Sequence, residues 1–362
     1  MQVLKIRENA RNVEEISWQI ARAKKMVVVT GAGISTSSGI PDFRSKGGLY
    51  EMIKDKFPNE KVTGQQLFDK SYLNNEKIRK MFYTFMGELY SLTTAAVPTM
   101  AHRFFKRLAD QKKIIHYYTQ NIDNLEAAVN LDAVQLHGTM SEVYCDMCKL
   151  TVQFTEMHAE VFKKGFPPQC NECQQREATR QASGKRKHRI GDLQPNITLY
   201  NDIDDTTRGA YIQNCVKNDL RKKIDYLLIA GTSLKVHGVK NLIRQLAKSV
   251  HHNGGKVVLV NLSGVGKEWN TVFDYQILAD VDEWAGLVEE HTGLDKTQKV
   301  LTGLANKTSK SVNVSISKGC VKRRRKDRDQ DRENAGSNND NNKKKALKRS
   351  KVEVLDVVET LQ

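Results

Sequence analysis

The stretch that decides the fold runs from residue 26 to residue 35 and reads Met26-Val27-Val28-Val29-Thr30-Gly31-Ala32-Gly33-Ile34-Ser35. Its first half is a short, apolar, β-branched run, as expected for a buried parallel strand. Its second half is a glycine turn, where backbone amides can approach a phosphate because no Cβ stands in the way. Alone the turn is a weak signal, since the common dinucleotide fingerprint needs a third glycine where this chain has Thr36.

Four further apolar runs end in the same way, each followed by small or polar residues. These runs and the clusters behind them are 114–118 with Thr119-Gln120-Asn121, 133–136 with His137-Gly138, 226–230 with Gly231-Thr232-Ser233, and 257–260 with Asn261-Leu262-Ser263. Helical patterns stand between the runs. The alternation predicts an α/β fold with a doubly wound, Rossmann-like parallel sheet. Because ligands of such sheets lie beyond the carboxyl ends of the strands, we expect the polar clusters to face one cleft.

Two long stretches interrupt the alternation and predict a smaller lobe. Residues 50–97 favour helix, and residues 144–191 contain four of the six cysteines. The remaining residues of the domain 1–292 then form the larger lobe, in the segments 1–49, 98–143 and 192–292. Residues 293–362 are polar and charged, and we expect a basic, largely disordered tail there, because such a segment buries too little apolar surface to offset chain entropy.

Two cysteine pairs in the second stretch have the spacing of a metal site. Cys145 and Cys148 form one CxxC knuckle, and Cys170 and Cys173 form another after a gap of 21 residues. Two such knuckles give four thiolates tetrahedral access to one zinc ion. A catalytic zinc keeps an open position for water, so four sulfur ligands indicate a closed structural site.

One histidine stands out among the nine. Only His137 lies at a predicted strand exit and is followed directly by glycine. A histidine in that position is more often structural than catalytic. However, another polar strand exit, Gln120-Asn121-Ile122-Asp123, is its predicted neighbour, and an imidazole titrates in the range useful for a general base. His137 is therefore our candidate catalytic residue.

Positive charge is concentrated in two segments. Of the formal net charge of +16, residues 176–189 supply +5 and residues 322–350 supply +7. Such blocks attract phosphate or acidic protein, although solvating disordered segments have the same composition. The run Lys322-Arg323-Arg324-Arg325-Lys326 favours nuclear import, which predicts an import receptor as a partner and the nucleus as the location. Contact with chromatin or nucleic acid stays open. We expect no signal peptide and no membrane partner, because residues 1–26 are charged throughout and no apolar stretch reaches the length of a span.

Taken together, these motifs resemble those of the sirtuins, in the same order along the chain, over about residues 27–287. The segments that carry the resemblance are Gly31-Ala32-Gly33-Ile34-Ser35, Ile40-Pro41-Asp42-Phe43-Arg44, Thr119-Gln120-Asn121-Ile122-Asp123, Leu136-His137-Gly138, both cysteine knuckles, Gly231-Thr232-Ser233-Leu234 and Val260-Asn261. The chain looks most like the nuclear, histone-directed branch familiar from fungi.

The resemblance implies an NAD-dependent protein-lysine deacetylase. Its substrate would be an acetylated protein, in this branch a histone, and its products nicotinamide and O-acetyl-ADP-ribose. Such an enzyme would contribute to chromatin silencing or genome maintenance. The cofactors implied are NAD and one structural zinc ion.

The resemblance also assigns roles to individual residues. His137 would be the general base, and Asn121 and Asp123 would be catalytic residues that hold the nicotinamide ribose and an ordered water. The cofactor-binding positions would be Gly31, Ala32, Gly33, Ser35, Asp42, Phe43, Arg44, Gln120, Asn121, Ile122, Asp123, Gly231, Thr232, Ser233, Asn261, Leu262 and Val281. The zinc ligands would be Cys145, Cys148, Cys170 and Cys173.

Two departures from the family pattern concern substrate choice. Tyr200-Asn201-Asp202 stands where many sirtuins have an aromatic residue, glycine and glutamate, and residues 235–239 lack a proline that is often present. Peptide preference therefore stays open. Two other functions are alternatives: ADP-ribose transfer to protein in the same cleft, and nonenzymatic binding of chromatin or nucleic acid. The intact Asn121, Asp123 and His137 favour deacetylation.

Overall fold

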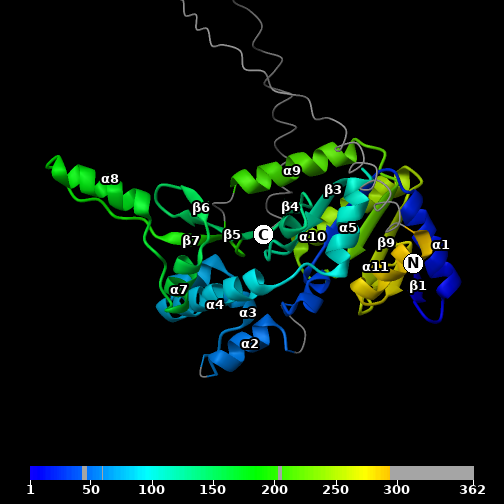
Figure 1. Cartoon of the computed structure of the whole chain (residues 1–362), viewed down its shortest axis with the longest axis horizontal. Helices are drawn as coiled ribbons and strands as arrows, with labels where there is room; N and C mark the ends of the chain where they lie inside the picture. Colours follow the sequence, from blue (N-terminus) through cyan, green and yellow to red (C-terminus); the bar gives the residue numbers. More distant parts are fainter. Residues whose placement is uncertain (43–46, 59, 203–205, 294–362) are drawn as a thin grey trace, which may run out of the picture.

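The computed structural model describes residues 1–42, 47–58, 60–202 and 206–293, and its larger sheet has seven parallel strands (Figure 1). Their order is β1-β10-β9-β8-β2-β3-β4. Their bounds are β1 Gln2–Lys5, β2 Met26–Thr30, β3 Ile114–Thr119, β4 Val134–Gln135, β8 Tyr226–Ala230, β9 Lys256–Asn261 and β10 Tyr275–Leu278. All five apolar runs singled out in the sequence form strands of this sheet.

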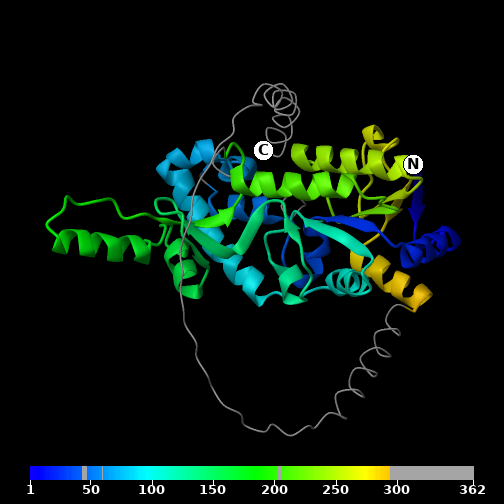
Figure 2. The same cartoon turned by 90° about the horizontal axis from the view of Figure 1, so that it is seen from above.

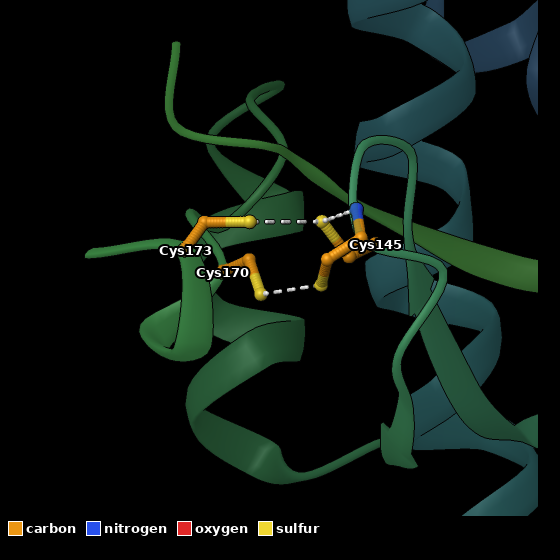
Figure 3. Close-up of side chains that lie close together, drawn as sticks. Cys145, Cys170 and Cys173 are labelled. Carbon is orange, nitrogen blue, oxygen red and sulfur yellow. Dashed lines mark hydrogen bonds between the residues drawn. The ribbon is translucent and has the colours of Figure 1, made fainter. Parts of the chain in front are cut away.

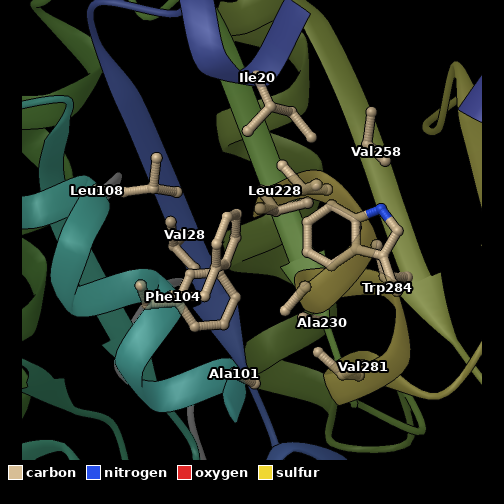
Figure 4. Close-up of a cluster of buried hydrophobic side chains, with 14 of the residues drawn as sticks. Ile20, Val28, Ala101, Phe104, Leu108, Leu228, Ala230, Val258, Val281 and Trp284 are labelled. Atoms are coloured by element: carbon tan, nitrogen blue, oxygen red, sulfur yellow. The ribbon is translucent and has the colours of Figure 1, made fainter. Parts of the chain in front are cut away.

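Helices cover both faces of the sheet. Helices α1 (Ala10–Arg22), α5 (Met100–Asp110) and α11 (Val281–Thr292) contribute to the core on one face, and α9 (Thr206–Leu220) and α10 (His237–His252) to the core on the other. Strand β2 serves both cores: Val28 packs with Phe104 and Trp284 (Figure 4), whereas Val27 and Val29 point to the opposite face. A strand buried on both faces is apolar at successive positions. The predicted doubly wound fold is confirmed.

A smaller lobe contains a three-stranded antiparallel sheet in the order β6-β5-β7 and several helices. Their bounds are α2 Leu49–Lys56, α3 Gly64–Leu67, α4 Glu76–Ala95, β5 Gly138–Cys145, β6 Thr151–Gln153, α7 Glu156–Lys163, α8 Asn171–Ala182 and β7 Leu193–Ile197. This lobe has its own core, in which Phe82, Phe154 and Phe162 are buried with Cys145 and Cys170. Strands β5 and β7 pair with each other and so carry the cysteine-containing stretch between them. Short elements complete the described chain: η1 Ala32–Ile34, η2 Thr36–Ser38, η3 Lys70–Asn74, α6 Leu125–Ala128 and η4 Lys267–Trp269.

Residues 171–189 form a basic arm that projects from the body of the molecule, as both Figure 1 and Figure 2 show for its helix α8. The arm is a folded hairpin, because the segment after the helix turns back along it. The backbone N–H of Lys185 donates to the carbonyl of Arg180 (3.0 Å), and that of His188 donates to the Glu177 carboxylate (2.9 Å). Arg180 in turn donates to the carbonyl of Arg186 (3.2 Å).

Two strands of the large sheet, β1 and β10, lie outside every predicted strand. Strand β1 is a four-residue edge strand with burial on one position only, Leu4, and β10 is equally short. Short strands of mixed polarity give little periodicity to recognise. The predicted tail falls, from residue 294 on, outside the described residues. Within those described, no helix is both long and apolar enough to span a bilayer.

Candidate functional site

Two glycine turns meet at the carboxyl edge of the sheet. Strands β2 and β8 are neighbours in register, Thr30 opposite Ala230, so Gly31 and Gly231 follow at the same level. The N–H of Gly33 donates to the Gly231 carbonyl at 2.8 Å. A Cβ on Gly33 would lie 2.7 Å from the Gly231 Cα, which is closer than real Cβ contacts come. Gly231 also has φ +62°. The contact between the turns therefore requires glycine on both sides.

A cavity of about 320 Å³ opens above these turns. Thirteen of the residues proposed from the sequence line it: Gly31, Ala32, Gly33, Asp42, Gln120, Asn121, Ile122, His137, Gly231, Thr232, Ser233, Asn261 and Leu262. All but Asp42 come from the exits of β2, β3, β4, β8 and β9, and Asp42 lies farther along the chain, after η2. The polar strand exits thus face one cleft, as the parallel topology predicts. Turns without a Cβ at residues 31, 33 and 231 let a pyrophosphate approach the backbone closely, so the residues present fit NAD.

Hydrogen bonds fix the polar side chains behind strand β3. Gln120 donates from Nε2 to the Thr30 carbonyl (3.0 Å) and to the Thr232 hydroxyl (2.9 Å), which ties three strand exits together. Asn121 donates from Nδ2 to the Ser35 hydroxyl at 3.1 Å. These contacts hold two amide side chains at the cavity wall.

The position of His137 is set by backbone contacts on both sides. The N–H of Leu136 donates to the Thr119 carbonyl (2.9 Å), and the N–H of Thr198 donates to the carbonyl of His137 itself (2.9 Å). Gly138 has φ +81°, and a Cβ there would lie 2.3 Å from the Asn196 carbonyl oxygen. Glycine is therefore needed after His137, because no other residue lets β5 turn away so closely against β7. His137 lines the same cavity as Gly31 and Asn121.

Five predicted cofactor residues are not among those that line the cavity. Ser35 and Asp123 are buried just beneath its wall, joined to it through Asn121. Val281 begins helix α11 and packs in the apolar core, as Figure 4 shows. Phe43 and Arg44 lie outside the described residues. The cofactor roles of these five, like those of the residues that line the cavity, stay predictions.

Nine further residues line the cavity that were not proposed as site residues: Thr36, Tyr50, Phe68, Ile197, Thr198, Leu199, Tyr200, Val236 and Ser263. Of these, Tyr200, Val236 and Ser263 lie in segments that the sequence analysis singled out. Tyr50 and Phe68 come from the helical stretch and look there like ordinary core residues. Phe68 is next to the loop of Tyr200, because the N–H of Tyr200 donates to the Phe68 carbonyl (2.8 Å) and the N–H of Lys70 donates to the Tyr200 carbonyl (2.9 Å). The ring of Tyr50 lies 6.2 Å from that of Phe68. The loop around Tyr200 is thereby tied to the helical stretch.

The four cysteines of the two knuckles gather in the smaller lobe (Figure 3). Their sulfur atoms all lie within 4.8 Å of one another, with Cys145 and Cys173 at 3.7 Å and Cys148 and Cys170 at 3.8 Å. Tetrahedral zinc with Zn–S bonds of ~2.3 Å requires sulfur separations of ~3.8 Å. The N–H groups of Met147 and Cys148 donate to the Cys145 sulfur, as suits a thiolate. The four thiols fit a closed structural zinc site, and none of them lines the cavity.

Comparison with known proteins places the chain in a family. A model of the Sir2 family matches residues 31–238. The chain is 38% identical over 305 residues to the NAD-dependent histone deacetylase HST3 of Candida albicans, covering 76% of this chain and 61% of that protein. It is 34% identical over 301 residues to the protein of the same name from Saccharomyces cerevisiae, covering 76% and 67%. The chain therefore spans less than two thirds of the length of the Candida relative.

Solved structures agree on the fold. A structure titled "Sir2-p53 peptide-NAD+" superposes with a TM-score of 0.58 at 24% identity, covering 77% of this chain and 98% of the other. One titled "Sir2 bound to acetylated peptide" gives 0.58 at 24% identity, covering 78% and 99%.

Proposed function

The chain belongs to the Sir2 family, and on that premise we propose that it is an NAD-dependent protein-lysine deacetylase acting on histones. One observation carries the proposal: His137, the glycine turn at 31–33 and Asn121 line a single cavity at the carboxyl edge of the sheet. An imidazole, a phosphate-accepting turn and sugar-binding amides are the groups that this reaction needs. The role in chromatin silencing or genome maintenance is part of the same proposal.

Different residues of the cavity would bind different parts of NAD or take part in the proton transfer. NAD, when bound, would supply the ADP-ribosyl group that accepts the acyl group while nicotinamide leaves. The N–H groups of Gly31, Gly33 and Gly231 already donate to carbonyls. Among the described residues of the two turns, the N–H groups of Ala32, Thr232 and Ser233 are therefore the ones that would bind its phosphates. Asn121 and Gln120 would orient the nicotinamide ribose. His137 would take the proton of the ribose hydroxyl that attacks the acyl carbon, a step for which a general base contributes roughly 10²–10⁴-fold.

Histone is the proposed substrate because the two relatives described above are named histone deacetylases. The acyl-lysine would enter beside Tyr200 and Val236, which line the cavity from the two segments that depart from the family pattern. Tyr200 is held by its backbone bonds to residues 68–70. The departures at these segments would then change which flanking residues are accepted and leave the chemistry unchanged.

The test is an assay of purified chain with acetylated histones, with and without NAD. We expect nicotinamide, deacetylated lysine and O-acetyl-ADP-ribose in equal amounts, and none of them without NAD. ADP-ribosylated protein formed without O-acetyl-ADP-ribose would replace the proposal by the transferase alternative. No NAD-dependent product on any acetylated histone would contradict both.

The proposed location is the nucleus, which is where the histone substrate would be met. The basic run at 322–326, proposed to bind an import receptor, lies outside the described residues.

Among the described residues, the basic arm at 171–189 is the segment that would contact nucleic acid. Lys185, Arg186 and Lys187 are exposed near the end of its hairpin, and no described acidic side chain forms an ion pair with them. A fixed cluster of unpaired cations attracts the phosphate backbone.

Charge reversal at the arm tests this contact. Substituting Lys185→Glu, Arg186→Glu and Lys187→Glu together should weaken binding of the full chain to duplex DNA about tenfold or more, and should reduce the slope of log affinity against log salt by up to about 3. The matched control is Lys217→Glu, Lys223→Glu and Lys248→Glu, three exposed lysines on and after helices α9 and α10. If both triple variants bind equally, the attraction is a net-charge effect and the arm is no contact site. Both should deacetylate a short peptide at the unmodified rate.

A further inference from the structure

Three ionisable side chains meet beneath the wall of the cavity. A ring nitrogen of His102 and one carboxylate oxygen from each of Asp123 and Glu126 lie within 4.8 Å of one another. The exposed fractions of these side chains are 0%, 8% and 2%. His102 comes from helix α5, Asp123 precedes helix α6, and Glu126 lies in it. Two carboxyl groups so close and so buried cannot both be ionised without a large cost.

The hydrogen bonds of His102 fix its tautomer. The backbone N–H of Thr99 donates to Nδ1 at 3.2 Å, so Nδ1 is the acceptor and a neutral ring carries its proton on Nε2. Nε2 is buried and has no hydrogen-bond partner among the described residues. Burial is the main reason why the pKa of His102 falls to about 4, with Asp282 opposing and Arg103 adding to the shift. The ring is therefore neutral at physiological pH and offers an N–H donor to the cluster.

The same tautomer disfavours a metal ion. A histidine ligand binds metal through an unprotonated nitrogen. Freeing Nε2 would require a proton on Nδ1, which would then face the Thr99 N–H donor. The cluster is consequently suited to hold protons.

Glu126 is the group that holds the extra proton. Its Oε1 is buried and has no hydrogen-bond partner among the described residues, while the Thr119 side chain bonds to the carboxyl group. Burial first, and then the charge of Asp123, raise the pKa of Glu126 to about 8. Tyr117 is the other titratable group that faces it, and burial raises the pKa of that phenol well above its ordinary value. At pH 7 the cluster then carries one negative charge.

That charge belongs on Asp123. Burial raises the pKa of Asp123 overall, but hydrogen bonds from the Ser35 side chain and from the N–H of Leu125 oppose that rise and stabilise its carboxylate. Ser35 also accepts from Asn121, which lines the cavity. The carboxylate of Asp123 is thereby linked through one hydroxyl to a side chain of the proposed cofactor site.

We propose that His102, Asp123 and Glu126 form a buried proton site in which protonated Glu126 and the Nε2–H of His102 hold Asp123 as the only anion, directly or through one water. Glu126 is a positioning residue: it acts through Asp123, Ser35 and Asn121 on the proposed NAD site, and this link to activity rests on the proposed function. Loss of its proton places a second anion beside Asp123 and disturbs that chain of contacts.

The test compares the native chain with Glu126→Gln, which keeps the size and hydrogen bonding of the protonated acid but cannot ionise. Glu14→Gln, at an exposed position on helix α1, is the control. In the NAD-free chain, we expect an infrared carbonyl band of a protonated carboxylic acid at pH 7 that Glu126→Gln alone removes. Absence of such a band, or its persistence in Glu126→Gln, would overturn the proposal whether or not the chain is a deacetylase.

Stability and rate give two further measurements. Because the folded chain keeps a proton on Glu126 that the unfolded chain releases above about pH 4.5, the stability contributed by this group falls as pH rises from about 4.5 to about 8. The Tm advantage of Glu126→Gln should grow over that window. The kcat/KM of the native chain should fall with an apparent pKa near 8, and Glu126→Gln should stay within about twofold at pH 7 and lack the alkaline fall. A tenfold loss at pH 7 with the alkaline fall retained would assign Glu126 a merely structural role.

Discussion

Substituting His137→Ala should lower NAD-dependent deacetylation by roughly 10²–10⁴-fold, the contribution of a well-placed general base. The backbone at this position is held by the bonds from residues 136 and 198, neither of which uses the imidazole. Gly138, which makes the close approach to β7, is unchanged. The fold and the cavity should therefore survive, and the loss should appear in kcat.

The measurements are the rate of lysine deacetylation, the affinity for NAD by calorimetry, and the thermal midpoint. His252→Ala, at an exposed position at the end of helix α10, is the matched control and should leave all three unchanged. A His137→Ala variant that deacetylates at the native rate would remove this residue from the mechanism. A variant that has lost both NAD affinity and its native Tm would give His137 a structural role.

Substituting Cys145→Ser should have the second large effect, the loss of zinc and of the ordered smaller lobe. Cys145 is fully buried, ends strand β5 and contacts Cys173. Zinc held by four thiolates contributes roughly 10–16 kcal/mol to the folding of small zinc domains, and a site with three thiolates and a hydroxyl holds it far more weakly. Helix α8 begins at the knuckle of Cys170, so the basic arm should lose its anchor.

We expect close to one zinc per native chain by elemental analysis and much less in Cys145→Ser. Hydrogen exchange should speed up in residues 138–197 while strands β2 and β8 of the large sheet stay protected. Cys215→Ser is the control, because this buried thiol lies on helix α9 outside the cluster and should retain the metal. Equal zinc in both variants would refute the four-thiolate assignment.

The sequence predicts the centre of the large sheet well, because strands buried on both faces are apolar at several successive positions. The edge strand β1 and its neighbour β10 give no such run. In β1, for example, Val3 is 49% exposed while Leu4 is buried. The residues that line the cavity likewise include some that the sequence predicts and some that it does not. Polar residues after buried strands, such as Gln120 and Asn121, are conspicuous in the sequence, and the parallel topology places them on one edge.

Some apolar residues that line the cavity could not be predicted from the sequence. Phe68 lies 5.7 Å from Phe85, ring to ring, and has the burial of any core aromatic. It lines the cavity together with Tyr200, whose backbone pairs with residues 68 and 70. Pairings between distant segments leave no periodicity in the sequence. The proton site shows the same limit, because His102 and Glu126 are 24 positions apart and read individually as helix residues.

The pairing of β1 with β10 constrains how the domain can be made. Gln2 aligns with Tyr275, so the outermost strand of the sheet finds its partner only after the ribosome has added more than two hundred further residues. Until then Leu4 has no sheet edge to cover, and contacts this distant in sequence form slowly. Nascent chains halted before residue 275 should therefore leave the edge of β9 exposed to other polypeptides.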